Sequence, residues 1–471
     1  YPYLSDLPSK IIGKEKMKFS KLSELFEQIQ GTASRLQMTQ QLCDIFNKAN
    51  EQEARVIAYL VMGELNAQYI GTKFNLAEKS VIKVVANLLG KTDYEVLVDL
   101  KKIGDLGSMV AEYDLKPQHD PSVIDIYDHL KKLEKLGGTG SQETKQKAMY
   151  DLLVMVDRLS AKYIIRIVLG TLRLGFSEMT VIDALSWMMV GDKSVREQVE
   201  HAYNLVADLG EIAAIAKKTG LDGIKKVAIE VGVPIRPAAA ERAANAAAII
   251  EKIGPCVVQP KLDGFRLQIH VKKTGHEHLV RFFSRNLLDM SNMFPDLVQF
   301  FLDLKVDSLI CEGEAIVYDE QTNSFAPFQE TVKRRRKHGV EQAASDLPLK
   351  LVIFDILYLN GNSLLAKTHA DRRKILLRLF DFDHRKKVVA IEEIAVNNKS
   401  NCSWASPSRK KVRGNDCMVF KDEEVDYYIK EKIALIIDDN NLSEIVVLNL
   451  ESNKQNKISL DSISPITAVT I

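Results

Sequence analysis

Cysteine is scarce in this chain: five residues are spread over 471 positions, and no two of them form a C-x-x-C pair. An odd and scattered set of cysteines argues against a disulfide framework and against a zinc knuckle, and it favours a reducing compartment. Long apolar runs are also missing, because none approaches the roughly 18 residues that a membrane span requires. The first residues, YPYLSDLPSKIIGKEK, lack the apolar core of a signal peptide. We therefore expect a soluble, intracellular protein.

Neither sign of charge is in excess: the chain has 64 Lys and Arg residues and 63 Asp and Glu residues, which gives a net charge of +1. Any contact with nucleic acid must therefore depend on a local basic surface. Hydrophobic residues make up 46% of the chain. This content excludes disorder throughout, and the length suggests about three domains.

The first half of the sequence has the periodicity of helices, with apolar residues that recur on one helical face. One such stripe consists of Leu22, Leu25, Phe26 and Ile29. Further on, Thr180 and Asp183 have the spacing of a capping box, which predicts a helix that opens at Thr180. We expect a single all-helical domain over residues 17–232.

The second half of the sequence is rich in short strands. Runs of Val, Ile, Phe and Tyr occur in CVVQPKLDGFRLQIHVKK, HLVRFFSR, SLICEGEAIVYD and LKLVIFDILYL. They predict an α+β domain built on antiparallel sheet over residues 233–425, with an alanine-rich helix at 235–254 near its start. Residues 1–16 and 426–471 continue neither pattern, so we treat them as an atypical extension and an atypical tail. The predicted fold class is a multidomain combination of α and α+β.

The most informative run is Lys261–Arg266, which places a lysine, a carboxylate, a glycine and an arginine between two strand-like segments. On composition alone these residues fit the exposed part of a hairpin turn. A lysine amine attacks phosphorus only when it is neutral, so a catalytic role needs neighbouring cations or desolvation to lower its pKa, and a metal to neutralise the phosphates. Arg266 and a bound cation would supply both.

Lys261–Arg266 resembles the K-x-D-G-x-R signature of ATP-dependent DNA ligases, RNA ligases and mRNA capping enzymes. Three later runs resemble further motifs of these enzymes and follow in the same order: RFFSRN, with Arg285 on a strand, LICEGEAIVYD, with Glu312 and Glu314, and IFDILYLNG, with Phe354. The two glutamates are two residues apart, so on a strand they share a face. For Glu312 a solvated or purely structural carboxylate fits as well as a functional one.

The resemblance implies a reaction in three steps. Lys261 attacks the α-phosphate of ATP and forms lysyl-AMP with loss of pyrophosphate; the adenylate passes to the 5′-phosphate of a nick; the 3′-hydroxyl then displaces AMP and closes the strand. Glu314 stands where the family has a glutamate that touches ribose or metal. A carboxylate that faces phosphates needs a divalent cation between them, and oxygen ligands favour Mg²⁺. The implied cofactors are ATP and Mg²⁺.

The resemblance also assigns roles around the nucleotide. Arg266 and Arg285 are placed for contacts to ribose, phosphate or the nick, Asp263 for orienting its neighbours or the 3′-hydroxyl, and Phe354 for stacking on adenine. Gln259 stands where the family usually has a glutamate that accepts from the adenine amino group. Its side-chain carbonyl can also accept, so we expect the choice of purine to survive this departure.

The helical half narrows the resemblance to DNA ligases. MKFSKLSELFEQIQ and TLRLGFSE, with Arg173 and Gly175, resemble the helical DNA-binding domain of archaeal and eukaryotic replicative DNA ligases. This implies a monomer that binds nicked duplex DNA without base readout in replication, repair and recombination, with a sliding clamp as a further candidate partner. We expect it to lie in the cytoplasm, as an archaeal or nucleoid-associated protein, or in the nucleus if the source is a eukaryote. The basic run Lys333–Lys337 fits either a phosphate-contacting loop or a solvated loop.

The sequence departs from the family most at its C-terminal end. The fifth motif, G-x-E-G-x-M-x-K, has its nearest match at Gly414–Lys421, with Asp416 and Lys421 as the candidate nucleotide-site residues. Nothing after Lys421 resembles the oligonucleotide-binding domain, so we expect a DNA ligase without that domain. Two alternatives stay open: an RNA ligase or capping-type nucleotidyltransferase, and a DNA-binding protein whose catalytic core has degenerated.

Overall fold

The computed structural model describes residues 16–117, 119–138, 140–238, 241–243, 256–275, 277–322, 324–336, 338–383, 386–396, 418–422, 433–436, 444–449 and 454–459. The chain divides into two compact units, Tyr1–Ala228 and Ile229–Ile471. Within the described ranges no helix is both long and apolar enough to cross a membrane.

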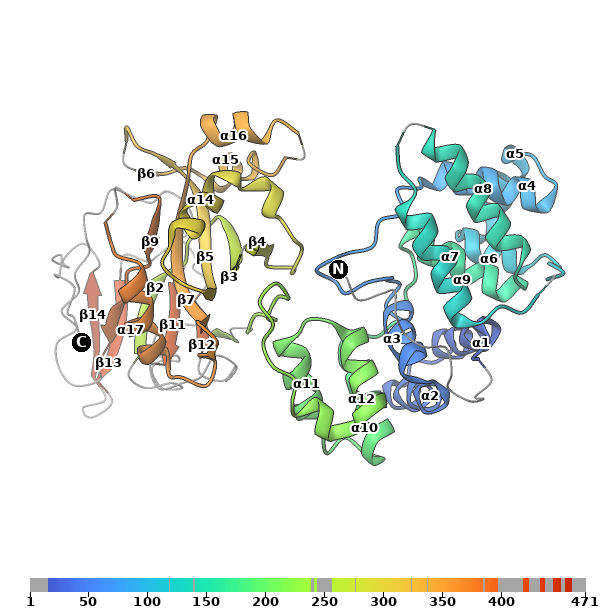
Figure 1. Cartoon of the computed structure of the whole chain (residues 1–471), viewed down its shortest axis with the longest axis horizontal. Helices are drawn as coiled ribbons and strands as arrows, with labels where there is room; N and C mark the ends of the chain where they lie inside the picture. Colours follow the sequence, from blue (N-terminus) through green and yellow to red (C-terminus); the bar gives the residue numbers. More distant parts are fainter. Residues whose placement is uncertain are drawn as a thin grey trace. The chain divides into compact units, whose positions relative to one another are not determined.

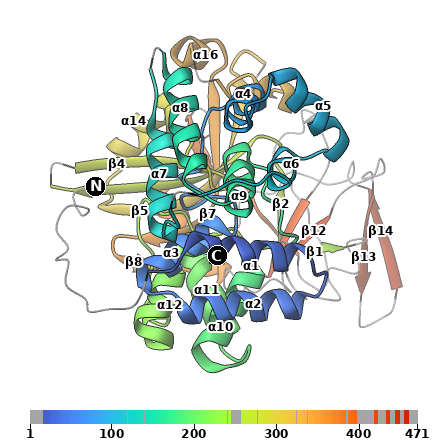
Figure 2. The ribbon, with the colours of Figure 1, turned by 90° about the vertical axis from the view of Figure 1, so that its right-hand side faces the viewer.

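The first unit is helical, as the periodicity predicts (Figure 1). Its helices are α1 Phe19–Gln30, α2 Arg35–Lys48, α3 Glu51–Leu60, α4 Glu78–Leu89, α5 Asp93–Ile103, α6 Leu106–Ala111, α7 Val123–Lys135, α8 Ser141–Val154, α9 Arg158–Leu169, α10 Glu178–Val190, α11 Arg196–Leu205 and α12 Leu209–Ile224. The predicted stripe is confirmed, since all four of its residues are buried in α1. Through this stripe α1 packs against α2 and α9 (Figure 2).

Local polar signals fix where several helices begin. Reciprocal capping boxes open α3, α5 and α7, and their pairs are Asn50–Glu53, Thr92–Glu95 and Ser122–Asp125. The capping box predicted at Thr180 is wrong, because α10 begins at Glu178 and Thr180 is buried inside it. Asp183 forms ion pairs with Lys193 at 2.6 Å and Arg196 at 2.9 Å instead of capping.

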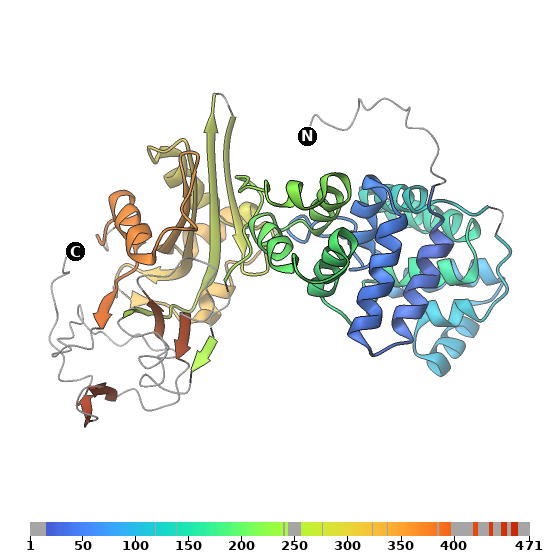
Figure 3. The same ribbon diagram turned by 90° about the horizontal axis from the view of Figure 1, so that it is seen from below.

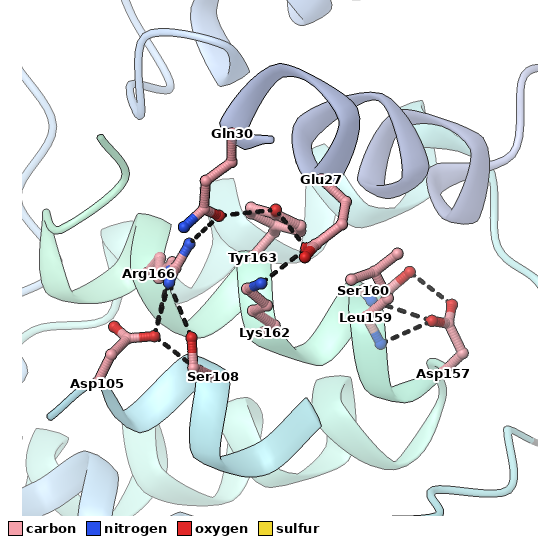
Figure 4. A network of polar contacts seen from close by, with 10 residues as sticks. All are labelled: Glu27, Gln30, Asp105, Ser108, Asp157, Leu159, Ser160, Lys162, Tyr163 and Arg166. Carbon is pink, nitrogen blue, oxygen red and sulfur yellow. Dashed lines mark hydrogen bonds and ion pairs between the residues drawn. The ribbon is translucent and has the colours of Figure 1, made fainter. Parts of the chain in front are cut away.

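A polar network fastens α1 and α6 to α9 (Figure 4). Lys162 forms an ion pair with Glu27 at 2.7 Å, and the Tyr163 hydroxyl donates to the same carboxylate at 2.8 Å. On the next turn of α9, Arg166 pairs with Asp105 at 2.8 Å. Burial acts to raise the pKa of the Glu27 carboxyl, but the bonds from Lys162 and Tyr163 and the charges of Lys162 and Arg166 outweigh it and lower this pKa. The network therefore specifies how the three helices pack without belonging to the nucleotide motifs.

The described part of the second unit is built on two main sheets, a separate two-stranded sheet and flanking helices (Figure 3). Its strands are β1 Glu241–Ala243, β2 Cys256–Pro260, β3 Phe265–Thr274, β4 Glu277–Ser284, β5 Ser308–Asp319, β6 Ser324–Phe325, β7 Leu349–Leu359, β8 Asn362–Ser363, β9 Val388–Ala390, β10 Ile394–Val396, β11 Met418–Asp422, β12 Ile433–Ile436, β13 Glu444–Asn449 and β14 Lys454–Ser459. Its helices include α14 Pro295–Asp303, α15 Phe328–Val332, α16 Val340–Asp346 and α17 His369–Leu379.

The larger sheet has the order β4-β3-β5-β7-β8, with β6 on β5 and β9 on β7. Its pairs are antiparallel except β7–β9. A second sheet has the order β1-β12-β11-β2-β10. The sequence therefore predicts the fold class correctly: a helical domain is followed by a domain based on antiparallel sheet.

The two faces of the larger sheet differ in character because side chains alternate along each strand. On β3, the residues that pack with α14 and α17 in the apolar core are Leu267, Ile269 and Val271. The alternate residues of the same strand form a polar face, which includes Arg266, Gln268 and His270. The motif residues Arg266, Glu312 and Glu314 lie on this polar face.

Two stretches of the second unit differ from the predictions. The alanine-rich helix expected at 235–254 is wrong where the structure describes it: residues 235–238 form no helix, and residues 241–243 form β1, which pairs in parallel with β12. The helix prediction for 239–240 and 244–254 lies outside the described residues. Because β12 also pairs with β11, the sheet continues past residue 425, where we expected the tail to begin. Backbone pairing thus overrides the helix preference of Glu241, Arg242 and Ala243.

The basic run Lys333–Lys337 is not uniformly exposed. Arg334 is fully buried and forms an ion pair with Asp296 of α14 at 2.6 Å, whereas Lys333 pairs with Glu330 at the surface. Lys387 reaches the other oxygen of Asp296 at 2.9 Å. One residue of the expected phosphate-contacting or solvated loop is therefore part of the core, and Lys337 lies outside the described residues.

Replacing Asp296 with alanine should strongly destabilise the second unit, because it leaves the buried Arg334 guanidinium without its carboxylate. We expect the free energy of unfolding to fall by about 3–5 kcal/mol. Hydrogen exchange of the β5 amides in rising urea measures it. Asp303→Ala, at the exposed other end of α14, is the matched control. An equal loss in both variants would contradict the buried pair.

Candidate active site

The loop that carries the candidate nucleophile joins the two sheets. It runs from Lys261 to Gly264, between β2 in one sheet and β3 in the other. Lys261 and Asp263 are exposed, whereas Leu262 packs against an apolar cluster on β7 and β9 and the residue after β9. The apolar anchor between two exposed polar residues presents the lysine amine to solvent at the junction of the sheets.

Gly264 holds this loop against β5. Its backbone N–H donates to the Glu314 carboxylate at 3.0 Å. A side chain here would not fit, because a Cβ atom would lie 2.5 Å from the Ala315 carbonyl oxygen. The glycine of the motif is therefore required for close backbone approach.

Burial raises the pKa of the Glu314 carboxyl to about 7. The Gly264 bond and the charges of Arg266 and Lys261 act in the opposite direction, and the charge of Asp263 adds to the rise. The charged residues of Lys261–Arg266, called the lysine motif below, thus surround the Glu314 carboxyl. Near neutral pH its charge is easily gained or lost.

Arg266 is held between a carboxylate and an aromatic ring. Its Nη2 donates to Oε2 of Glu312 at 2.7 Å, and its guanidinium carbon lies 5.5 Å from the centre of the Phe354 ring. Phe354 lies at a bulge of β7: Glu312 and Gly313 of β5 pair with Asp355 and Ile353, so the register shifts at Phe354. A bulge re-aims a side chain in this way.

Glu312 is only 1% exposed, which excludes the solvated carboxylate that the sequence left open. The prediction that it shares a face with Glu314 is confirmed, since both carboxylates bind the segment around Arg266 from one side of β5. Its ion pair makes Glu312 a partner of Arg266.

Gln259, two residues before Lys261, is buried on β2. Its amide nitrogen donates to Glu393, a carboxylate that also binds His369 at 2.8 Å and Arg373 at 3.3 Å. Since an ionised carboxylate only accepts, this contact leaves the side-chain oxygen of Gln259 as the end that can accept from another group.

For the remaining predicted site residues, the structure gives at most a position in a strand, turn or loop. Arg285 is exposed in the turn after β4, so its expected position on a strand is wrong by one residue. Lys421 lies on β11, which pairs with β2 beside the lysine motif. Asp416 lies outside the described residues. In the helical unit, Arg173 and Gly175 are exposed in the loop between α9 and α10.

The residues around Glu314 fit a magnesium ion that takes most of its ligands from substrate. Among the described residues, no three His, Cys, Asp or Glu side chains gather into a metal cluster. Mg²⁺ in phosphate-transfer sites is usually bound by one or two carboxylates together with phosphate oxygens and water. Glu314, with Asp263 nearby, supplies oxygen donors of this kind.

Comparison with protein families agrees with this geometry. A family described as "DNA ligase N terminus" matches residues 18–186, and one described as "ATP dependent DNA ligase domain" matches residues 237–436. The chain belongs to the ATP-dependent DNA ligase family. The second match covers the lysine motif, the strands of the polar face and β12.

Individual relatives carry the same name. A "Probable DNA ligase" of Dictyoglomus turgidum is 40% identical over 361 residues, which are 76% of this chain and 61% of that protein. "DNA ligase 2" of Thermofilum pendens is 36% identical over 377 residues, 77% of this chain and 62% of that protein. The chain thus spans about three fifths of the length of these ligases. A solved mycobacterial DNA ligase D with ATP and MES aligns with 45% of this chain and 62% of its own, at 23% identity and a TM-score of 0.31.

Sequence reasoning missed several residues that surround the ligase motifs. Gln268 and His270 follow Arg266 at alternate positions of β3, and a polar residue at every second position of an otherwise apolar strand was a usable signal. Glu393 has no such signal, because it reaches Gln259 from 134 positions away in the chain.

The raised pKa of Glu314 predicts a distinctive pH dependence of stability. The folded carboxyl has a pKa of about 7 and the ordinary value is 4.5, so the folded protein binds more protons between these values and loses stability as pH rises through them. Glu314→Gln removes this loss. With a metal chelator present, the urea midpoint of the Glu314→Gln variant should exceed that of the unsubstituted chain at about pH 8. The two midpoints should be closer at about pH 5. Glu320→Gln, at an exposed site after β5, is the control; a gain independent of pH would contradict the raised pKa.

Proposed function

We propose that this chain is an ATP-dependent DNA ligase that seals nicks in duplex DNA through lysyl-AMP and DNA-adenylate. The observation that supports it most is the arrangement around Lys261: an exposed amine on a loop tied to Glu314, beside Arg266 and Phe354. A nucleophile, a cation, a carboxylate and an aromatic ring then surround the place where a nucleoside triphosphate would lie.

In the first step, Nζ of Lys261 forms a bond to the α-phosphorus of ATP as the bond to pyrophosphate breaks. Arg266, held by Glu312, offers its guanidinium to ribose or phosphate, and Phe354 offers a ring face to adenine. Mg²⁺ bound by Glu314 would neutralise charge on the phosphates. The same residues serve the later steps, in which AMP moves to the 5′-phosphate and is displaced by the 3′-hydroxyl.

The helical unit would hold the nicked duplex. The exposed loop between α9 and α10 presents Arg173, and Gly175 follows with a φ of +79°, a conformation that suits glycine. A long side chain beside a small one allows close approach to phosphate and sugar without reading the bases. This indifference suits an enzyme that seals nicks of any sequence.

Lys261→Ala should abolish covalent labelling by radioactive ATP, because the nucleophile is lost. Nicked-DNA binding should remain, since it depends on the helical unit. Denaturing gels measure the label and filter binding measures affinity. Lys273→Ala, a substitution of another lysine in the same unit, is the control and should keep the label.

Three substrates separate this function from its alternatives: labelled ATP, labelled GTP, and a nick that already carries 5′-adenylate. Label from ATP and sealing of the adenylated nick support the ligase. Label from GTP alone indicates a capping-type enzyme, and DNA binding without label or sealing indicates a degenerate core. Either of these results would overturn the proposal.

Arg173→Ala should weaken binding of nicked and intact duplexes alike, and it should reduce the slope of log affinity against log salt by about one. The reason is that the variant loses one contact to phosphate and no contact to a base. Titrations at several salt concentrations measure the slope. Arg158→Ala, exposed at the opposite end of α9, is the control. Equal slopes for both variants would contradict a phosphate contact at Arg173.

A further inference from the structure

The segment 232–235, near the start of the second unit, is fastened to β3 by two buried polar side chains. The Gly232 N–H donates to Nδ1 of His270 at 3.0 Å. The Ile235 N–H donates to Oε1 of Gln268 at 2.7 Å, and Nε2 of Gln268 donates back to the Ile235 carbonyl at 2.9 Å. His270, Gln268 and Ile235 are all buried, so water cannot replace these bonds.

The direction of each bond is determined. Because Nδ1 of His270 accepts from Gly232, its proton must be on Nε2, which donates to Oε1 of Gln268 at 2.9 Å. Burial lowers the pKa of His270 to about 3, which agrees with a neutral ring. With its oxygen occupied by two donors, Gln268 can turn only its nitrogen toward β5.

That nitrogen reaches the glutamate that binds Arg266. Nε2 of Gln268 donates to Oε1 of Glu312 at 3.2 Å, while Oε2 of Glu312 accepts from Arg266 at 2.7 Å. Each oxygen of the buried carboxylate therefore has a donor, and its rotation is fixed. The series of bonds ends at the guanidinium, which lies over Phe354 in the proposed ATP site.

We propose that Gln268 is a positioning residue for ATP binding: it transmits the docking of residues 232–235 through Glu312 to Arg266. The inference rests on the proposed function, because it takes Arg266 as a contact of ATP. Without Gln268, the carboxylate of Glu312 loses one donor and can rotate. Glu312 then holds Arg266 less firmly, and ATP must order the guanidinium further on binding.

The test is a double-substitution cycle on the Michaelis constant for ATP in lysyl-AMP formation. Gln268→Met keeps the length of the side chain and removes its hydrogen bonds. We expect it to raise KM about tenfold, as for the loss of a hydrogen bond to a charged group. Arg266→Lys should raise KM by itself, and adding Gln268→Met to it should cause little further change, because Gln268 acts through Arg266. Gln299→Met, an exposed glutamine on α14, is the control and should leave KM unchanged.

A residue that only stabilises the fold would give effects that multiply in the double variant. Multiplying effects, or an unchanged KM in Gln268→Met, would overturn the inference while labelling of the unsubstituted chain continued. If that chain formed no lysyl-AMP, the proposed function would fail and this inference with it. Gln268→Asn, polar but one methylene shorter, serves the same cycle if the methionine variant does not fold.

Discussion

The hydrogen bond from Gly264 to Glu314 ties the Lys261–Gly264 loop, which joins the sheets of β2 and β3, to β5. The loop has four residues, and its glycine passes so close to β5 that a Cβ atom would overlap the Ala315 carbonyl. Lys261 is therefore fixed relative to Glu314 by the backbone. A flexible lysine side chain on a rigid loop can reach a phosphorus atom while the loop itself stays in place.

The polar face of the larger sheet holds the arginine of the ligase motif against a buried carboxylate. On β3, alternate side chains serve two purposes: Leu267 and Ile269 pack under helices, while Arg266 and Gln268 face Glu312. Burying a carboxylate is costly unless both oxygens are bound. The structure meets this requirement with one charged and one neutral donor, and the charged donor is the arginine of the ligase motif. Packing and chemistry are thus coupled within a single strand.

Much of the fold was predictable, because it depends on periodicity. The stripe on α1, the strands of the second unit and the shared face of Glu312 and Glu314 all follow from side-chain spacing. What could not be predicted depends on contacts distant in sequence. Arg334 is in the core only because Asp296 lies opposite, and Gln259 meets Glu393 from far along the chain.

Local signals also failed where a competing interaction was stronger. Asp183 had the spacing of a cap, but two cations bind it, so α10 starts earlier. The alanine-rich segment favours a helix, yet residues 241–243 pair with β12. In both places tertiary pairing outweighed a local preference of about 1 kcal/mol or less.

Peptide mapping of the adenylated protein tests most directly whether Lys261 is the nucleophile. The full chain is incubated with ATP and Mg²⁺, digested at neutral to mildly alkaline pH, and analysed by mass spectrometry for AMP attached through nitrogen. The account predicts a single modified peptide, with AMP on Lys261. AMP on a different lysine, with Lys261 recovered unmodified, would contradict it.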